Sequence, residues 1–114
     1  MHPLTLECYI KPEGAERSEP AGRVRFAISP ADHRRMEEAE EKLQHSDDRE
    51  TMLNVDLTKL DLDLPPHVEA LEKCQLRVYL HEEDERGHFH LVGHRKGDHS
   101  LFYTNAVMVD FVAS

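Results

Sequence analysis

Histidines are the residues of this sequence whose type and spacing best suit chemistry. Five of the nine histidines lie between positions 75 and 112, and two of these form the pair His88-x-His90. Imidazole nitrogens bind Zn²⁺ and other divalent transition metals. Alternate residues of a strand share one face about 6.5 Å apart, so this pair can meet ligands of a neighbouring strand. The predicted metal ligands are His81, Glu83, His88 and His90.

A binding surface is a second interpretation of the same stretch. Aromatic and apolar side chains stand among the histidines, and an open patch of this kind is unusual on a monomer. It suits a second copy of the chain, paired about a twofold axis, or a small-molecule or protein ligand. The predicted interface residues are Tyr79, His81, His90, Val92, His94, Leu101 and Tyr103. The plain alternative is that a short helix or the 58–64 segment covers this face within one chain.

The sequence contains no arrangement of residues that suits nucleophilic catalysis. Asp98-His99-Ser100 has the residue types of a catalytic triad, but consecutive positions on a strand or turn point apart. Cys8 falls on the apolar phase of the first strand, which predicts a buried and inert thiol. The sequence therefore favours a small non-enzymatic binding or interaction protein. The alternative is a His-ligated protein of Zn²⁺ or a similar ion, with or without enzymatic activity.

The charge balance of the chain is acidic. Fourteen Lys and Arg against 23 Asp and Glu give a formal net charge of −9. This balance disfavours nucleic acid and anionic membranes as partners, and it allows a third interpretation, an acidic inhibitor of a basic protein. Two distant cysteines indicate no disulfide framework, and the start M-H-P-L-T-L-E lacks the features of a signal peptide. We therefore expect a cytoplasmic protein with no membrane or nucleic-acid partner.

The histidines are placed by a predicted three-strand antiparallel meander. In 75–83, apolar residues alternate with polar ones, as in a strand with one buried face. The runs 88–94 and 99–112 continue this pattern after four-residue loops at 84–87 and 95–98, in which glycines supply positive φ angles.

The loop lengths set the cross-strand register of this meander. Two four-residue loops place Tyr79 opposite Val92, so that the outer face has an apolar centre. A six-residue first loop would instead pair Tyr79 with His90 and His81 with His88. Both registers keep the histidines on one face.

The remaining elements are predicted from local patterns. Strands at 4–11 and 23–28 form a hairpin with a long polar connection. Ser29-Pro30 is a helix start, because Ser caps the first-turn amides and Pro at the first position loses no hydrogen bond. The helix extends to about residue 44, with a narrow apolar stripe that places it across one sheet face. That stripe consists of Met36, Ala39 and Leu43.

The middle of the chain is predicted less completely. A third strand spans 53–57, and the segment 60–64 is either an edge strand or an extended crossover. Pro65-Pro66 starts a short helix to about Lys73. The 114 residues are thus predicted to form a single α+β domain, 1–114, with five or six mainly antiparallel strands. Its C-terminal part is the three-strand meander, and the main helix, about 30–44, packs on one face.

Overall fold

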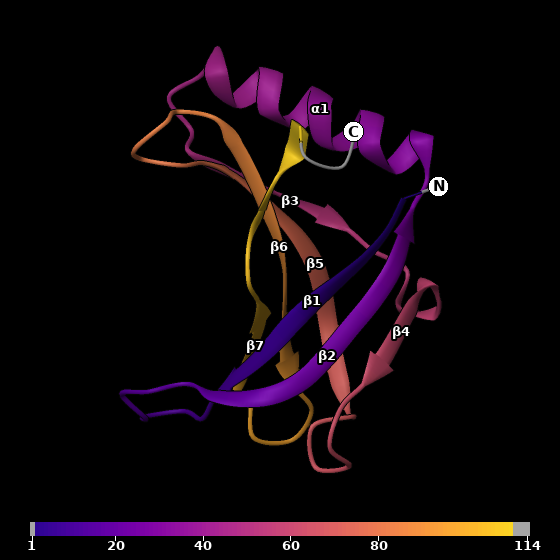
Figure 1. The fold of residues 1–114 in the computed structure, drawn as a ribbon. Helices are drawn as coiled ribbons and strands as arrows, with labels where there is room; N and C mark the ends of the chain where they lie inside the picture. The colour runs from indigo at the N-terminus through magenta and orange to yellow at the C-terminus, as the bar shows by residue number, and fades with distance from the viewer. Residues whose placement is uncertain (1, 111–114) are drawn as a thin grey trace.

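One curved antiparallel sheet with a helix across it makes up the computed structural model, which describes residues 2–110 (Figure 1). The sheet has eight strands, in the order β3-β5-β6-β7-β1-β2-β4, and β8 pairs with β6. The strands are β1 His2–Lys11, β2 Glu19–Ile28, β3 Glu50–Asn54, β4 Leu60–Asp63, β5 Leu71–Leu80, β6 Gly87–Arg95, β7 Leu101–Thr104 and β8 Val107–Met108. Within the described residues this is a single α+β domain, as predicted, but the sheet is larger than the five or six strands expected.

Two features account for the larger sheet. The segment 60–64 forms an edge strand, β4, which pairs with β2. The final predicted strand is broken after Thr104, so that β7 and β8 pair with different parts of β6. The end of that predicted strand, residues 111–112, lies outside the described residues.

Helix α1, Pro30–Gln44, has the bounds predicted from the sequence. The Ser29 hydroxyl accepts the Asp32 N–H at 3.1 Å, which satisfies one of the free amides of the first turn. Its buried side chains are the predicted stripe, and they pack on the inner face of the sheet. In residues 2–110 no helix is long and apolar enough to span a membrane.

The hydrophobic core fills the space between the curved sheet and α1. Alternate residues of β1, β2, β5 and β6 point into it, as the period-two patterns predict. The largest fully buried side chains of the core are Phe89, Phe102, Leu6, Ile28, Met36 and Leu91. Cys8 is buried among them, which confirms its predicted place in the core.

The predicted short helix after Pro65 does not form. Residues 65–68 make a single turn, closed by a hydrogen bond of 2.8 Å from Val68 N–H to Pro65 O. Strand β5 then begins at Leu71, and eight of its ten residues pair with β6. The ladder with β6 satisfies more backbone groups than two further helical turns would, so tertiary pairing overrides the local signal. Val68 is nevertheless buried, as expected.

The predicted third strand is displaced toward the N-terminus. β3 spans Glu50–Asn54 instead of 53–57. Asp56 ends it, because its carboxylate accepts the Thr58 N–H at 2.9 Å and caps a 3₁₀ turn at Leu57–Lys59. Leu57 is therefore exposed and not inward-facing.

The three-strand meander is confirmed, but its register differs from both predicted registers. The first loop is closed by a bond of 2.9 Å from His81 N–H to Arg86 O, and the second by a bond of 2.9 Å from Arg95 N–H to Ser100 O. Each loop contains four residues, as predicted, but the first is displaced by two residues and the second by one. Consequently Tyr79 lies opposite His88.

Candidate functional site

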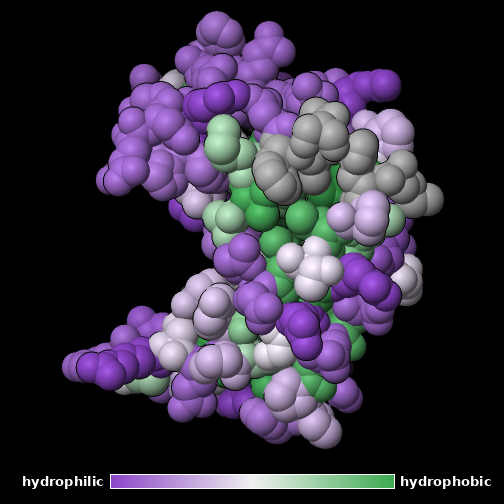
Figure 2. All heavy atoms as spheres, in the orientation of Figure 1, coloured by the Kyte–Doolittle hydropathy of each residue, from purple (hydrophilic) through white to green (hydrophobic). Residues whose placement is uncertain are grey.

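The outer face of the sheet, on the side away from α1, carries the predicted tyrosines and histidines. We use the term outer face for the half-buried side chains Tyr9, Arg77, Tyr79, His88, His90, Val92 and Tyr103 of β1, β5, β6 and β7. Figure 2 shows the molecule hollowed beside β7, between the end that carries α1 and the projecting β1–β2 loop (compare Figure 1). Neither of the two segments that were expected to cover this face does so, because 60–63 lies at the edge beyond β2 and 65–73 is not a helix.

One half of the outer face is aromatic. Tyr9 lies opposite Tyr103, and their rings stack with centroids 5.5 Å apart. The Tyr103 hydroxyl donates to Ser18 Oγ at 2.7 Å, which ties the β1–β2 loop to this face. Val92 lies opposite Tyr103 on the other side. An apolar surface with polar edges of this kind is typical of contact sites.

His90 lies in the middle of the outer face, and both of its ring nitrogens have partners. Nδ1 donates to the carbonyl oxygen of Thr104 at 3.1 Å, and Nε2 accepts from the Arg77 guanidinium at 3.2 Å. Burial lowers the pKa of His90, and the nearby Arg77 charge lowers it further, so the ring is neutral at pH 7. Arg77 thus occupies the lone pair that a metal ion would need.

Arg77 itself is fixed by two further neighbours. It forms an ion pair with Glu50 of β3, and its guanidinium lies over the Tyr79 ring, 4.3 Å from the centroid. Cation–π and ion-pair contacts together hold the group in place. The Tyr79 ring also contacts His88 and His90, at centroid distances of 5.8 and 5.7 Å.

Three potential metal ligands gather where the outer face meets the β5–β6 loop. One ligand atom each of His81, Asp84 and His88 lies within 4.8 Å of the other two. His88 Nε2 is 3.2 Å from Asp84 Oδ2, and His81 Nδ1 is 3.9 Å from Asp84 Oδ1. The two imidazole rings stack with centroids 4.6 Å apart. We call these three residues the His81–Asp84–His88 cluster.

Asp84 is held in its ionised form within this cluster. Its carboxylate accepts the Arg86 N–H at 2.9 Å, and this bond is the largest cause of a pKa below the ordinary value of an aspartate. The contact with His88 lowers that pKa further. A carboxylate that stays ionised and keeps oxygen lone pairs free is a suitable metal ligand.

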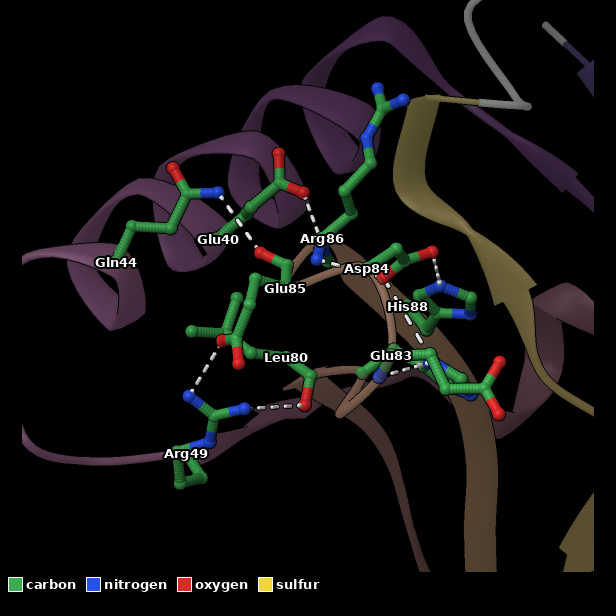
Figure 3. A network of polar contacts seen from close by, with 11 residues as sticks. Glu40, Gln44, Arg49, Leu80, Glu83, Asp84, Glu85, Arg86 and His88 are labelled. Carbon is green, nitrogen blue, oxygen red and sulfur yellow. Dashed lines mark hydrogen bonds and ion pairs between the residues drawn. The ribbon is translucent and has the colours of Figure 1, made fainter.

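The loop that carries the cluster is held from outside by α1 and by the start of β3 (Figure 3). Glu40 of α1 accepts the Gly87 N–H, and Gln44 donates to the Glu85 carbonyl at 3.5 Å. Arg49 pairs with the Glu85 carboxylate at 2.9 Å. The helix thus contacts the C-terminal side of the loop, whereas Arg49 contacts both sides, because it also donates to Leu80 O at 3.4 Å.

Glu85 adopts the left-handed conformation of this loop, with φ 57°. Gly87 was expected to supply a positive φ, but it lies in β6 and serves another purpose. A β-carbon at Gly87 would lie 2.7 Å from Cδ of Glu40, so a larger residue there would require the Glu40 side chain to move. The positive φ of the first loop is thus supplied two residues earlier than predicted, at Glu85.

The predicted metal ligands are only partly brought together. His81 and His88 are adjacent, whereas His90 is engaged by Arg77 as described above. Glu83 is exposed in the loop and contributes its backbone N–H, which donates to His81 Nδ1 at 3.3 Å. The third member of the cluster is Asp84, which the sequence did not predict. The spacing His81-x-x-Asp84-x-x-x-His88 across a tight loop was its only signal.

The predicted interface residues are spread along the sheet. Tyr79, His90, Val92 and Tyr103 form the middle of the outer face. His81 lies at the loop end of β5. At the opposite end, the exposed His94 and Leu101 pair with each other and line an open cavity with Lys11, Lys73 and His99.

Comparison with known proteins adds no assignment, because no protein-family model, no curated protein and no solved structure matches this chain.

Proposed function

We propose that this chain is a divalent transition-metal-binding protein, with the His81–Asp84–His88 cluster as its ligand set. The observation that carries the proposal is the convergence of three ligand atoms within 4.8 Å in a loop held by α1 and β3. Two imidazoles and one carboxylate are a ligand set that suits Zn²⁺ and similar ions. Zn²⁺ is the ion we name for the tests.

Small movements bring the cluster to metal-binding geometry. Ligand atoms at about 2.0–2.1 Å from a tetrahedral Zn²⁺ stand about 3.4 Å apart. The distance of 3.2 Å between His88 Nε2 and Asp84 Oδ2 already meets this value. His81 Nδ1 accepts only a long bond of 3.3 Å from Glu83 N–H, which a metal bond would replace. Its side chain is 37% exposed and therefore has room to turn.

Three protein ligands leave one position of a tetrahedral ion for water or another group. This position is compatible with a non-enzymatic role in which the ion contributes to binding at the adjacent outer face. Tyr79 contacts His88, so a ligand on the outer face would lie next to the ion. We therefore favour metal-assisted binding over catalysis, because the cluster adjoins the outer face through the contact between Tyr79 and His88.

Isothermal titration calorimetry with Zn²⁺ on untagged protein tests the metal site. We expect one ion per chain, and affinity at least tenfold weaker in Asp84→Asn and His88→Gln, which keep the size of each side chain. His94→Gln and Asp98→Asn are matched controls from the other loop of the meander and should bind as the wild type does. No binding by the wild type, or equal loss in the controls, would refute the proposal.

A second candidate function is binding of a small-molecule or protein ligand at the outer face itself. It is favoured by the position of α1, which packs on the opposite face and leaves the stacked Tyr9 and Tyr103 half-exposed. Tyr103→Ala should then abolish ligand capture in a fragment screen followed by NMR, whereas Leu57→Ala, an exposed position elsewhere, should not. If every fragment that binds does so outside the outer face, this second candidate function is excluded.

A further inference from the structure

Among residues 2–110, no strand pairs with the outer backbone edge of β3, and a side chain contacts this edge at its end, where Arg35 donates to Asn54 O. The inner edge of β3 pairs with β5, and Leu80 N–H donates to Arg49 O at 3.0 Å. Hydrogen-bonded and non-hydrogen-bonded pairs alternate along an antiparallel ladder, so Thr51 and Leu53 bond to β5. The N–H and C=O groups of Glu50, Met52 and Asn54 therefore point away from the sheet.

β3 lacks three of the features that commonly prevent edge strands from pairing. Lysine, proline and β-bulges serve this purpose in natural sheets. The strand E-T-M-L-N contains no lysine or proline, its ladder with β5 is regular, and the Met52 side chain is 43% exposed. The other edge, β4, alternates leucine with aspartate and is followed closely by Pro65-Pro66.

A groove of about 640 Å³ adjoins the same edge, between α1 and β3. Its apolar side chains include Ala39 and Leu43 of α1 and Leu53 of β3. A strand added beside β3 would turn every second side chain toward this groove. The side chains of the partner strand that face the groove therefore meet Ala39, Leu43 and Leu53, so at least one of them should be apolar.

We propose that the occupant is β3 of a second copy, so that two sheets join into one across a twofold axis. The antiparallel register that pairs all three outward-facing residues places Met52 opposite Met52 of the partner subunit and Glu50 opposite Asn54 of the partner subunit. Thr51 then faces Leu53 of the partner subunit on the groove side. The two methionines cover each other on the outer side, so apolar surface is buried on both faces.

In this arrangement the charges along the groove of one copy are complementary to those of the other copy. Arg35 lies at one end, where its guanidinium donates to Asn54 O at 3.3 Å. Asp48 lines the groove at the other end of β3, whereas the Glu50 carboxylate forms an ion pair with Arg77 on the outer face. Twofold pairing brings the basic end of each copy against the acidic end of the other, so Arg35 meets Asp48 of the partner subunit. Opposite charges so placed favour this register and steer association.

This dimer does not depend on the metal cluster, which lies at the far end of β5 from Asn54. It also differs from a dimer through the outer face, because Tyr9 and Tyr103 remain uncovered. The two geometries can be distinguished by substitutions at Met52 and Tyr103.

Size-exclusion chromatography with light scattering over a concentration series is the first test, on the full chain. We expect a dimer that Met52→Pro weakens at least tenfold, because proline removes an outward N–H that β5 does not use. Met52→Thr keeps the N–H and should remain dimeric, within about threefold of the wild type. A wild type that stays monomeric, or a dimer that persists in Met52→Pro, overturns the proposal.

A mixing experiment tests the register even if Met52→Pro fails to fold. Arg35→Glu and Asp48→Arg should each be monomeric alone, since each places like charges together twice in a homodimer. An equimolar mixture restores both opposite-charge contacts and should elute as a heterodimer. Failure of the mixture to associate while wild-type protein dimerises would overturn the twofold register.

Discussion

The Glu40 carboxylate of α1 accepts the backbone N–H of Gly87 at the start of β6 (Figure 3). This contact joins the helix to the loop that carries the metal cluster, across 47 positions of sequence. A hydrogen bond to a charged acceptor contributes about 1.5–3 kcal/mol when it is well sheltered, and less when it is partly exposed.

Glu40→Ala should therefore destabilise the protein by about 1–2 kcal/mol in urea unfolding. It should also weaken Zn²⁺ binding several-fold, because the cluster loses its support from α1. Glu41→Ala is the matched control, since Glu41 is exposed one position further along the helix. Equal effects of the two substitutions would show that helix propensity, and not the contact with Gly87, is responsible.

Gly93→Ala should destabilise the sheet by about 1–3 kcal/mol through overpacking. Gly93 lies opposite a β-bulge in β5, where Lys73 has φ 55° and the ladder shifts between Glu72 and Gln75. A β-carbon there would lie 2.7 Å from Sγ of Cys74 and 3.2 Å from the Glu72 carbonyl oxygen. Thermal unfolding measures the loss.

The clash with the thiol can be separated from the clash with the backbone. Combined with Cys74→Ala, the substitution at Gly93 should cost less than the sum of the two single changes. Strict additivity would contradict the steric explanation.

Stability should fall on acidification because of His90. Its pKa in the folded protein is lowered, chiefly by burial, so the unfolded chain binds a proton at higher pH than the folded chain does. The stability linked to this group is complete above a pH of roughly 6.5 and is lost as the pH falls through the lowered pKa.

Urea unfolding at pH 7.5 and 5.5 measures this linkage. The wild type should lose more stability than His90→Asn, whose amide can still donate to the Thr104 carbonyl. The difference cannot exceed about 1.4 kcal/mol per pH unit for one group. His67→Asn, at an exposed turn, should keep the wild-type slope. If the free energy of unfolding of His90→Asn falls between pH 7.5 and 5.5 as much as that of the wild type, His90 is not the source of the pH dependence.

Both cysteines should resist thiol reagents in the folded protein. Burial raises the pKa of the Cys8 thiol to about 12 and that of Cys74 to about 11, and the thiolate is the reactive form. At pH 8, a disulfide reagent should label the native chain no faster than the chain unfolds. In guanidinium, where the chain is unfolded, it should label both thiols immediately. Rapid labelling of native protein would contradict the burial of these groups.

Local patterns predicted the elements that local interactions determine. The bounds of α1 follow from the Ser29 cap and good helix formers, and its buried stripe follows from a 3.6-residue period. The side of each strand that faces the core was also predicted correctly, since more buried and more exposed residues alternate along β1 and β5 as expected.

Long-range contacts determine what the sequence left unpredicted. Glu40 of α1 reaches Gly87 at the start of β6, and no local signal in 84–87 reveals this contact. With the loop placed two residues late, Glu83 was paired with His88, and Asp84 was assigned to the turn instead of the ligand set. The helix predicted after Pro65 failed for the same reason, because pairing with β6 outweighs a local helix start.

The most direct test of the metal site is an anomalous difference map at the zinc absorption edge, from crystals of untagged protein grown with Zn²⁺. We expect a peak at about 2.0–2.2 Å from nitrogens of His81 and His88 and from an oxygen of Asp84. A crystal whose only peaks lie elsewhere, for example at His94 and His99, would contradict it.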